Sequence, residues 1–571
     1  MTPRLSALVL VTTLALLPAA ALGKRKPPPP PAPVASAGAL VDNIDGVTLD
    51  GDGHPLHFTG LLLDKGGRVV RLLKAGEARP ERLDWRADMK GRVLLPGFID
   101  SHGHVMDLGF RLLELDLSGT HSLAEAQARI AAYAAANPDH KWILGGGWNQ
   151  EEWGLGRFPT AADLDKVVGD RPVALTRIDS HAVWMNSAAM KAAGVTAATK
   201  APTGGRIERE GGKPIGIFTD AARQMVMQAV PQPRAVDRDN AFLAAQEALL
   251  AKGITATDDM RTTLPDWLVF RRAGDRGALR LRIESYADSI ETANLTAGAG
   301  PSPWLYGDRL RLIGVKIFAD GALGSRGAWL KAPYADAPGE RGQGFWTDDQ
   351  LRNLMSRAAM DHFQVAVHAI GDRANAEVLG AIDELSQTYK GDRRWRIEHA
   401  QVIDPADLPL FRDKGIVAAM QPIHQLSDMK MAEARLGPPR LAGAYAWASV
   451  QRAGATLAFG SDYPNDDFSP FHGWAAAVAR DGQPQERLSR EAAWRAYTVD
   501  AAYAGFAEGV MGRLAPGQQA DFVIVDREPL QASPAELRDA KVLETWVGGT
   551  KVWDASRAAR IPRQDSPRND E

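Results

Sequence analysis

The sequence predicts an α/β protein: a (β/α)8 TIM-type barrel with an inserted subdomain and a small β-sandwich built from both chain ends. Between residues 96 and 508, eight apolar runs alternate with helical patterns, as a (β/α)8 barrel requires. Strand-like segments flank this region at 39–95 and 509–554. A gap at about 107–233 is too long for one barrel helix, so it must hold the insertion.

The first 38 residues precede this architecture. Arg4, the apolar run from Leu5 to Leu17 and small residues up to Gly23 are typical of a secretory signal peptide over 1–23. An uncleaved membrane anchor is the alternative, although the apolar run is short for a span. The proline-rich residues 24–38 predict an extended, disordered tether. We therefore expect an exported protein, periplasmic or secreted.

The flanking segments combine apolar runs with glycine turns. GVTLDGDGHPLHFTGLLLDKGGRVVRLL near the start and GRLAPGQQADFVIVD and KVLETWVGGTKVWD near the end are typical of strands around turns. Short β segments at opposite ends of a chain often pair, which predicts the small β-sandwich. Residues 555–571 are expected to form a disordered tail.

The eight predicted barrel strands follow one another along the middle of the chain. They lie in the segments RVLLPGFIDSH, GITATDD, ALRLRIESYAD, RLIGVKIFADG, FQVAVHAIGD, WRIEHAQ, GIVAAMQPIH and ATLAFGSDYP. Active sites of such barrels form at the carboxyl ends of the strands. Polar residues at these ends are therefore the first candidates for function.

Composition narrows the chemistry. The 571 residues carry a formal net charge of −3, without the basic excess that nucleic-acid binding needs. The chain has no cysteine, which excludes disulfides, thiolate metal sites and a cysteine nucleophile. Any metal must be held by His, Asp, Glu or a modified Lys. No later segment predicts a transmembrane helix, so no stable membrane insertion is expected after signal cleavage.

The first barrel strand ends in two histidines, His102 and His104. Residues i and i+2 of a strand share one face, about 6.5 Å apart, so both imidazoles could bind one metal ion. Asp100 shares this face and could orient a ligand. The alternative is two unrelated surface histidines beside a turn, because the motif alone is weak.

Later strands also end in polar residues. Lys316 ends LIGVK, His368 ends VAVH, His399 ends RIEH, and Asp462 follows LAFGS. A hydrogen-bonded core residue would explain any one of them, since a buried polar group without a partner is costly. Four such residues in this order on an eight-strand pattern favour a functional site instead.

These motifs resemble those of the amidohydrolase superfamily over nearly the whole mature chain. LPGFIDSHGH is similar to its strand-one metal motif, and GRLAPGQQADFVIVD to the return into its small β domain. GGGWNQEEW, SHAVWMNS, VKIFADGALGSR, HAIGDRAN, RIEHAQ and GSDYP resemble the branch that includes N-substituted formamide deformylases, the amidohydrolase 3 family. The motifs are specific for fold and metal site, and weakly specific for substrate.

The resemblance implies two divalent metal ions. His102, His104 and Asp462 would bind the first, and His368 and His399 the second. Imidazole and oxygen ligands favour zinc, with manganese, iron, cobalt and nickel also open.

Lys316 would bridge both ions as an Nζ-carbamate formed with carbon dioxide. A protonated amine repels cations, whereas a carbamate is an anionic oxygen ligand. A plain amine in a one-metal site, or one paired with Asp320, is the alternative.

The ligand set implies a mechanism. A metal acidifies a water and polarises the substrate carbonyl. Asp462 accepts the proton from the attacking water and passes it to the leaving nitrogen. His181, in the insertion motif DSHAVWMNS, is a second catalytic candidate, as a hydrogen-bond partner of the substrate. A structural histidine that caps a turn is equally compatible.

Further residues could line a pocket. Trp148, Trp153 and Trp184 would form an apolar wall over the site or pack the core of the insertion. The segment DGALGSRGAWL is either a substrate loop with Arg326 facing the cleft or a glycine-rich turn. His424 ends the seventh strand segment and is a weaker pocket candidate.

Together these features predict a metal-dependent hydrolase that cleaves a C–N bond, other than a peptide bond, in an amide, formamide or cyclic amide. A lactone or ester hydrolase is the nearest rival, since the same chemistry attacks either carbonyl. A ring deaminase, which usually needs one metal, and a catalytically silent binding protein also stay open. The partner is a small-molecule substrate, and a homodimer is compatible with such enzymes.

Overall fold

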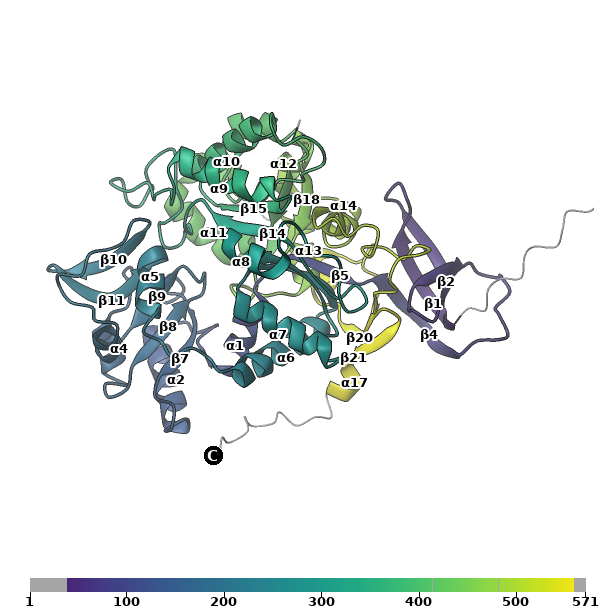
Figure 1. The fold of residues 1–571 in the computed structure, drawn as a ribbon, viewed down its shortest axis with the longest axis horizontal. Coiled ribbons are helices and arrows are strands. Elements are labelled where there is room, and N and C mark those ends of the chain that lie inside the picture. The colour runs from purple at the N-terminus through teal and green to yellow at the C-terminus, as the bar shows by residue number, and fades with distance from the viewer. Residues whose placement is uncertain (1–37, 413, 481, 559–571) are drawn as a thin grey trace, which may run out of the picture. The chain divides into compact units, whose positions relative to one another are not determined.

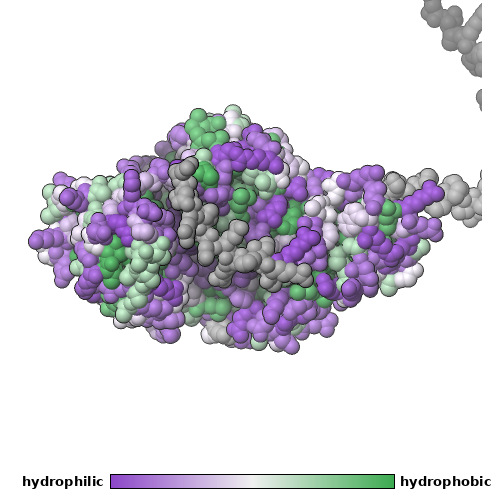
Figure 2. Space-filling view, turned by 90° about the horizontal axis from the view of Figure 1, so that it is seen from below, coloured by the Kyte–Doolittle hydropathy of each residue, from purple (hydrophilic) through white to green (hydrophobic). Residues whose placement is uncertain are grey.

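The computed structural model describes residues 38–412, 414–480 and 482–558. The predicted signal peptide (1–23), residues 24–37 of the predicted tether and residues 559–571 of the predicted tail lie outside this range. Within the described part, no helix combines the length and hydropathy that crossing a bilayer requires. On the face drawn in Figure 2, hydrophilic residues predominate and hydrophobic residues gather in small separate groups.

The predicted barrel is confirmed. One sheet of eight parallel strands has the order β18-β17-β16-β15-β14-β13-β12-β5, and each predicted segment supplies one strand. The strands are β5 (Phe98–Gly103), β12 (Ile254–Thr262), β13 (Arg282–Ala287), β14 (Leu310–Phe318), β15 (Gln364–Ala369), β16 (Arg396–His399), β17 (Val417–Met420) and β18 (Thr456–Phe459). Beyond the end of β18, the Asp462 N–H donates to the His102 carbonyl (2.7 Å) and brings the two edge strands together.

The segment RVLLPGFIDSH belongs to two sheets. β4 (Trp85–Pro96) ends one residue before Gly97, and β5 begins one residue after it. A Cβ at position 97 would lie 2.2 Å from the Thr255 Oγ1, so only glycine fits this close approach. The chain passes from the small β domain into the barrel at this residue.

Helices surround the barrel sheet (Figure 1). They are α1 (Val105–Leu113), α6 (Ala235–Ala251), α7 (Leu264–Asp275), α8 (Ile290–Ala297), α9 (Asp348–Met360), α10 (Asp372–Leu385), α11 (Pro422–Leu436), α12 (Trp447–Ala453), α13 (Pro470–Ala479), α14 (Arg490–Ala496) and α15 (Val499–Ala504). Short 3-10 helices span Pro405–Phe411, Pro438–Gly443 and Pro484–Glu486. Side-chain oxygens of Thr263, Ser289 and Thr347 cap backbone N–H groups and fix where α7, α8 and α9 begin.

Strands from both chain ends pair into the predicted small β domain, in which seven strands form one continuous sheet. Its order is β21-β20-β19-β4-β1-β2-β3. Besides β4, the strands are β1 (Ala39–Leu49), β2 (Pro55–Leu63), β3 (Val69–Leu73), β19 (Phe522–Val525), β20 (Val542–Val547) and β21 (Thr550–Asp554). The long strand β4 joins the two groups because it pairs with β1 along most of its length and with β19 at its end. The Val69 N–H donates to the Gln518 carbonyl (2.8 Å), so the sheet curls around a single core.

The insertion lies between α1 and α6, slightly shorter than the predicted range 107–233. Its six-stranded sheet has the order β10-β11-β9-β8-β7-β6. The elements are β6 (Leu115–Asp116), α2 (Leu123–Ala136), β7 (Ile143–Trp148), α3 (Ala161–Asp165), β8 (Val173–Arg177), β9 (Ala182–Met185), α4 (Ser187–Ala192), β10 (Gly205–Glu210), β11 (Lys213–Thr219) and α5 (Asp220–Met227). It has an apolar core of its own, distinct from the core of the barrel.

The predicted tail begins with structure. Residues Ala555–Ala558 form the short helix α17. The Asp554 carboxylate accepts hydrogen bonds from the Ser556 N–H (2.9 Å) and hydroxyl (2.7 Å), a local cap that the prediction of disorder overlooked.

Candidate metal centre

The six predicted ligands meet at the carboxyl ends of the barrel strands. They come from β5, β14, β15 and β16 and from the segments that follow β5 and β18: His102, His104, Lys316, His368, His399 and Asp462. All are buried except His104, whose side chain is 13% exposed. Residues far apart in the sequence thus form one small polar cluster at the edge of the barrel from which the insertion extends.

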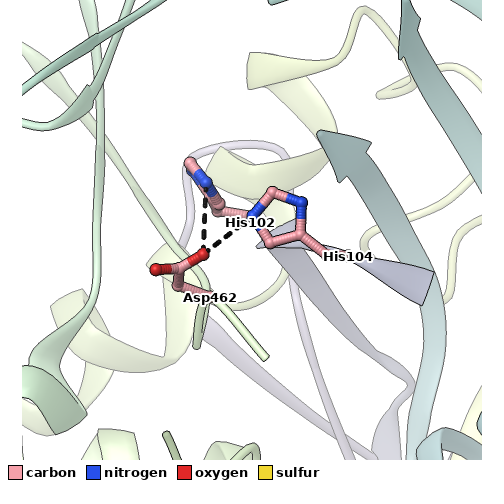
Figure 3. Close-up of side chains that lie close together, drawn as sticks. All are labelled: His102, His104 and Asp462. Carbon is pink, nitrogen blue, oxygen red and sulfur yellow. Dashed lines mark ion pairs between the residues drawn. The ribbon is translucent and has the colours of Figure 1, made fainter. Parts of the chain in front are cut away.

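His102 and His104 flank the Asp462 carboxylate (Figure 3). The Nε2 atoms of the two imidazoles lie 3.6 and 3.0 Å from the Asp462 Oδ1. His102 is on β5, but His104 is the N-cap of α1, so the pair is not on one strand as the i, i+2 argument assumed. Ligand atoms of the three residues lie within 4.8 Å of one another, as a shared metal ion would require.

His368 and His399 lie beside this trio. Their ring centroids are 4.6 Å apart, and the His399 ring is 4.7 Å from the His102 ring. The Lys316 Nζ is 3.1 Å from the His102 Nε2, and no ion pair joins it to Asp320 among the described residues. Lys316 therefore lies against the first group of ligands, and its charge also acts on His368 and His399.

Backbone strain directs two of these side chains. His399 (φ +73°) and Asp462 (φ +57°) have left-handed backbones. Side chains alternate along a strand, so Arg396 and Glu398 point into the barrel and a regular continuation would point His399 outward. The left-handed backbone at His399 instead turns its ring towards the site. Such conformations cost about 1–3 kcal/mol each and persist where the surroundings enforce them.

Hydrogen bonds orient three of the imidazoles through Nδ1. The acceptors are the Glu398 Oε2 for His102 (2.6 Å), the Met260 carbonyl for His104 (2.6 Å) and the Gln421 Oε1 for His399 (2.9 Å). Each acceptor places the proton on Nδ1 and leaves the Nε2 lone pair free for a ligand.

The ionisation states also suit a metal. Burial lowers the pKa of His102 to about 4 and that of His368 and His399 well below the usual histidine range, so all three are neutral at pH 7. Although burial opposes it, the close approach of the His104 ring, followed by the rings of His102 and His399, holds the pKa of Asp462 well below its usual value. Neutral imidazoles and an ionised carboxylate are the forms that bind metal.

The Nε2 of His368 is poorly satisfied. It is buried and makes no hydrogen bond to any described residue, and the Asp320 Oδ1 lies 3.5 Å away, at ion-pair distance only. An unpaired buried nitrogen costs free energy unless something binds it. Together with the oriented Nε2 atoms and Asp462, it makes this donor set fit a divalent metal ion.

The insertion brings His181 to the same edge of the barrel. Its ring centroid is 5.3 Å from that of His368, and its Nδ1 donates to the Asp220 Oδ1 at 2.7 Å. The Asp220 N–H donates in turn to the His181 carbonyl (2.8 Å). Burial opposes protonation, but Asp220 raises the pKa of His181 overall. His181 thus presents Nε2 to the site while Nδ1 is fixed.

Of the other residues predicted to line a pocket, the three tryptophans and Arg326 do not face the metal centre. Trp148, Trp153 and Trp184 pack in the core of the insertion and form no wall over the site. Arg326 pairs with Asp336 (2.8 Å) and is not free to face a cleft.

His424, on α11, does approach the centre. Its Nε2 lies 3.9 Å from the Asp462 Oδ2, and ligand atoms of His399, His424 and Asp462 also fall within 4.8 Å of one another.

Sequence reasoning missed Glu398 and Asp220. Glu398 directly precedes His399 in RIEH, so its position in the motif was the only available signal. Asp220 lies 39 residues from His181, and only the fold shows that the two side chains meet.

An eight-stranded barrel with these donors at the carboxyl ends of its strands defines a metal-dependent hydrolase. The chain belongs to the Amidohydrolase family, whose pattern matches residues 87–553. The resemblance inferred from the motifs is thereby confirmed.

Curated relatives agree with this assignment. The chain is 34% identical to "Protein LONG AFTER FAR-RED 3" of Arabidopsis thaliana, covering 82% of this chain and 83% of that protein. It is 32% identical to "Putative amidohydrolase YtcJ" of Bacillus subtilis (86% and 94% covered) and 27% identical to "N-substituted formamide deformylase" of Arthrobacter pascens (81% and 88%). Among solved structures, an uncharacterized metal-dependent hydrolase from Pyrococcus furiosus matches with a TM-score of 0.68 at 29% identity, covering 86% of this chain and all of that one.

Proposed function

We propose that the chain hydrolyses a C–N bond in an amide, formamide or cyclic amide. The observation that carries this proposal is the meeting of neutral imidazoles and the ionised Asp462 at one edge of the barrel. The similarity to an N-substituted formamide deformylase favours amides over the esters and lactones that the same chemistry could attack.

We propose that two divalent ions, zinc by preference, bind here. His102, His104 and Asp462 would hold one ion, and His368 and His399 the other. Such ions polarise the carbonyl and lower the pKa of water when they are bound.

Lys316 would bridge the two groups of ligands as a carbamate. Burial lowers the pKa of Lys316 to about 8, which raises the fraction of neutral amine at pH 7. The neutral Nζ forms a bond to the carbon of carbon dioxide and loses one proton, which yields the anionic carbamate.

Asp462 moves the proton. The carboxylate takes a proton from the attacking water and delivers it to the nitrogen of the breaking C–N bond, which leaves as an amine. The Asn465 amide donates to the Asp462 Oδ2 at 2.9 Å and holds the carboxylate in place. The Nδ1–H of His181 is donated to Asp220, which favours the imidazolium, and in that form His181 donates a hydrogen bond from Nε2 to the substrate carbonyl.

Paired substrates test the proposal. N-benzylformamide and benzyl formate share an acyl group and differ in the bond that breaks. We expect the wild type to hydrolyse the amide and Asp462→Asn to lose about 10²- to 10⁴-fold in kcat, while Asp392→Asn, an exposed control, keeps full activity. Hydrolysis of the ester alone would replace the proposal with esterase activity.

We also propose that the protein is exported, because residues 1–23 have the composition of a signal peptide. Cell fractionation of the full chain and of a chain lacking 2–23 tests this. Recovery of both in the same compartment would contradict export.

A further inference from the structure

A second charged cluster lies beside the metal centre, where the insertion meets the barrel. Its centre is Arg223, on α5 one turn after Asp220. The Arg223 Nε is buried without a hydrogen-bond partner, and no ion pair joins Arg223 to any described residue. The residue as a whole is half-buried, and leaving part of a guanidinium out of contact with both water and an anion is costly.

The acidic groups near Arg223 are engaged elsewhere. Asp220 accepts the His181 Nδ1–H (2.7 Å), and Asp179 pairs with Arg177 (2.5 Å). The third carboxylate, Asp107, accepts a hydrogen bond at its Oδ2 from the Arg261 Nη2 (3.0 Å). None of these carboxylates lies within ion-pair distance of Arg223, although their negative charges act to raise its pKa.

The neighbour of Arg223 across the boundary is another cation, Arg261. Burial, and next the repulsion from Arg261, lower the pKa of Arg223 to about 10, which leaves the guanidinium charged at neutral pH. Arg261 already has Asp107 as its partner, whereas Arg223 has no anion within ion-pair distance, so an anion bound to Arg223 would offset its burial and this repulsion.

Arg261 ties this cluster to the site. It follows Met260, whose carbonyl accepts the His104 Nδ1–H at 2.6 Å. Its backbone is left-handed (φ +80°), a costly conformation for a residue with a long side chain. Arg261 therefore lies one residue from a hydrogen-bond partner of the His104 ring, and its charge also acts on Lys316.

We propose that Arg223, with Arg261 beside it, binds a carboxylate of the substrate, so that the amide cleaved at the metal centre is a carboxylated one. The substrate class rests on the proposed function, whereas the anion subsite does not. A planar carboxylate matches the guanidinium fork and accepts two parallel hydrogen bonds from it. Arg223 lies one turn after Asp220, which orients His181 beside His368, so the carboxylate would bind on the insertion side of the same centre.

Turnover of a matched pair tests the substrate class. N-formylphenylalanine and N-(2-phenylethyl)formamide differ only by a carboxylate. We expect the wild type to favour the carboxylated amide in kcat/KM, and Arg223→Ala to reduce that preference about 10- to 100-fold. Arg223→Lys should recover part of it through charge alone. Gln224→Ala, an exposed change on the same helix, should leave the preference unchanged.

Binding tests the subsite without turnover. Calorimetry compares 3-phenylpropionate with the neutral 3-phenylpropanamide on the same variants. We expect tighter binding of the carboxylate to the wild type, weakened by salt and lost in Arg223→Ala.

The outcomes separate the two proposals. If neither formamide is hydrolysed but 3-phenylpropionate binds through Arg223, amide hydrolysis fails and the carboxylate subsite stands. If the neutral formamide is hydrolysed and no carboxylate preference appears, or if Arg223→Ala retains the preference, the subsite is refuted and amide hydrolysis stands.

Discussion

Glu398 accepts the Nδ1–H of His102 at 2.6 Å, and both side chains are completely buried. The other carboxylate oxygen accepts the Arg396 Nε–H at 2.8 Å. Although burial opposes it, Arg396 and then His102 keep the pKa of Glu398 below its usual range, so the residue stays anionic. Glu398 thus connects Arg396, inside the barrel, to the His102 ring and fixes the orientation of that predicted metal ligand.

Glu398→Gln should weaken metal binding about 10- to 100-fold, because the loss of a partner behind a ligand typically has this effect. Glutamine has one acceptor oxygen, whereas Glu398 uses two to accept three N–H groups, one from His102 and two from Arg396, so at least one of these must face an amide N–H. A titration with a competing chelator measures the affinity. Glu291→Gln, an exposed change, is the control. Equal affinities in all three proteins would refute the role of Glu398.

Lys316→Ala should lower the metal content of the purified protein. We expect about two ions per chain in the wild type prepared with bicarbonate, and fewer in the variant, because the bridging carbamate is gone. Mass spectrometry of the intact wild type should show the added carbon dioxide. One ion per chain, unchanged in the variant, would remove Lys316 from the site and favour a ring deaminase.

The pH dependence of stability should reveal the buried His102. Its pKa falls from 6.5 in the unfolded chain to about 4 in the fold, so the unfolded state binds more protons between pH 6.5 and 4. Protonation in this window therefore destabilises the metal-free fold as the pH falls, by about 3 kcal/mol.

Urea denaturation of the metal-free wild type and of His102→Asn, at pH 7 and pH 5, measures this effect. The stability of the wild type should fall more between the two pH values than that of the variant. Burial raises the pKa of Asp100 and Asp320 to about 7, which acts in the opposite direction in both proteins. The difference between the two proteins is hence the relevant quantity, and identical differences between pH 7 and 5 would contradict the buried neutral imidazole.

The sequence predicted the parts of this fold that follow from local pattern. Each of the eight apolar runs became a barrel strand, because a buried parallel strand needs a continuous apolar stretch that can be recognised locally. The six polar residues at the strand ends converge for the same reason, since parallel strands place their carboxyl ends at one edge.

The remaining features depend on long-range geometry. The single curled sheet arises because β4 pairs with both β1 and β19, and no local pattern reveals which two neighbours a strand will have. Asp220 and Arg223 follow an insertion strand and carry no recognisable motif. Asp220 meets His181 once β11 has paired with β9 inside the insertion, whereas Arg223 comes near Arg261 only where the insertion packs against the barrel.

Asp220 should act through His181. Asp220→Asn removes the charge that fixes the imidazole, and we expect kcat to fall about 10- to 100-fold with little change in KM, because an oriented hydrogen bond is lost mainly in the transition state. The pH profile of kcat should also shift, since Asp220 raises the pKa of His181. A merely structural role would leave that profile in place.

Gly321→Ala offers an independent perturbation of the same pair. A Cβ at position 321 would lie 3.0 Å from the Asp220 Oδ1 and 3.1 Å from the Gly327 backbone, so the carboxylate must shift. Gly339→Ala is the matched control, because a Cβ there meets no atom within 4 Å. We expect Gly321→Ala to lower kcat in the same manner as Asp220→Asn, and the double variant to fall no further than either alone. Additive losses would show that Asp220 and the Gly321 segment act separately, and that the loop does not hold the His181–Asp220 pair in place.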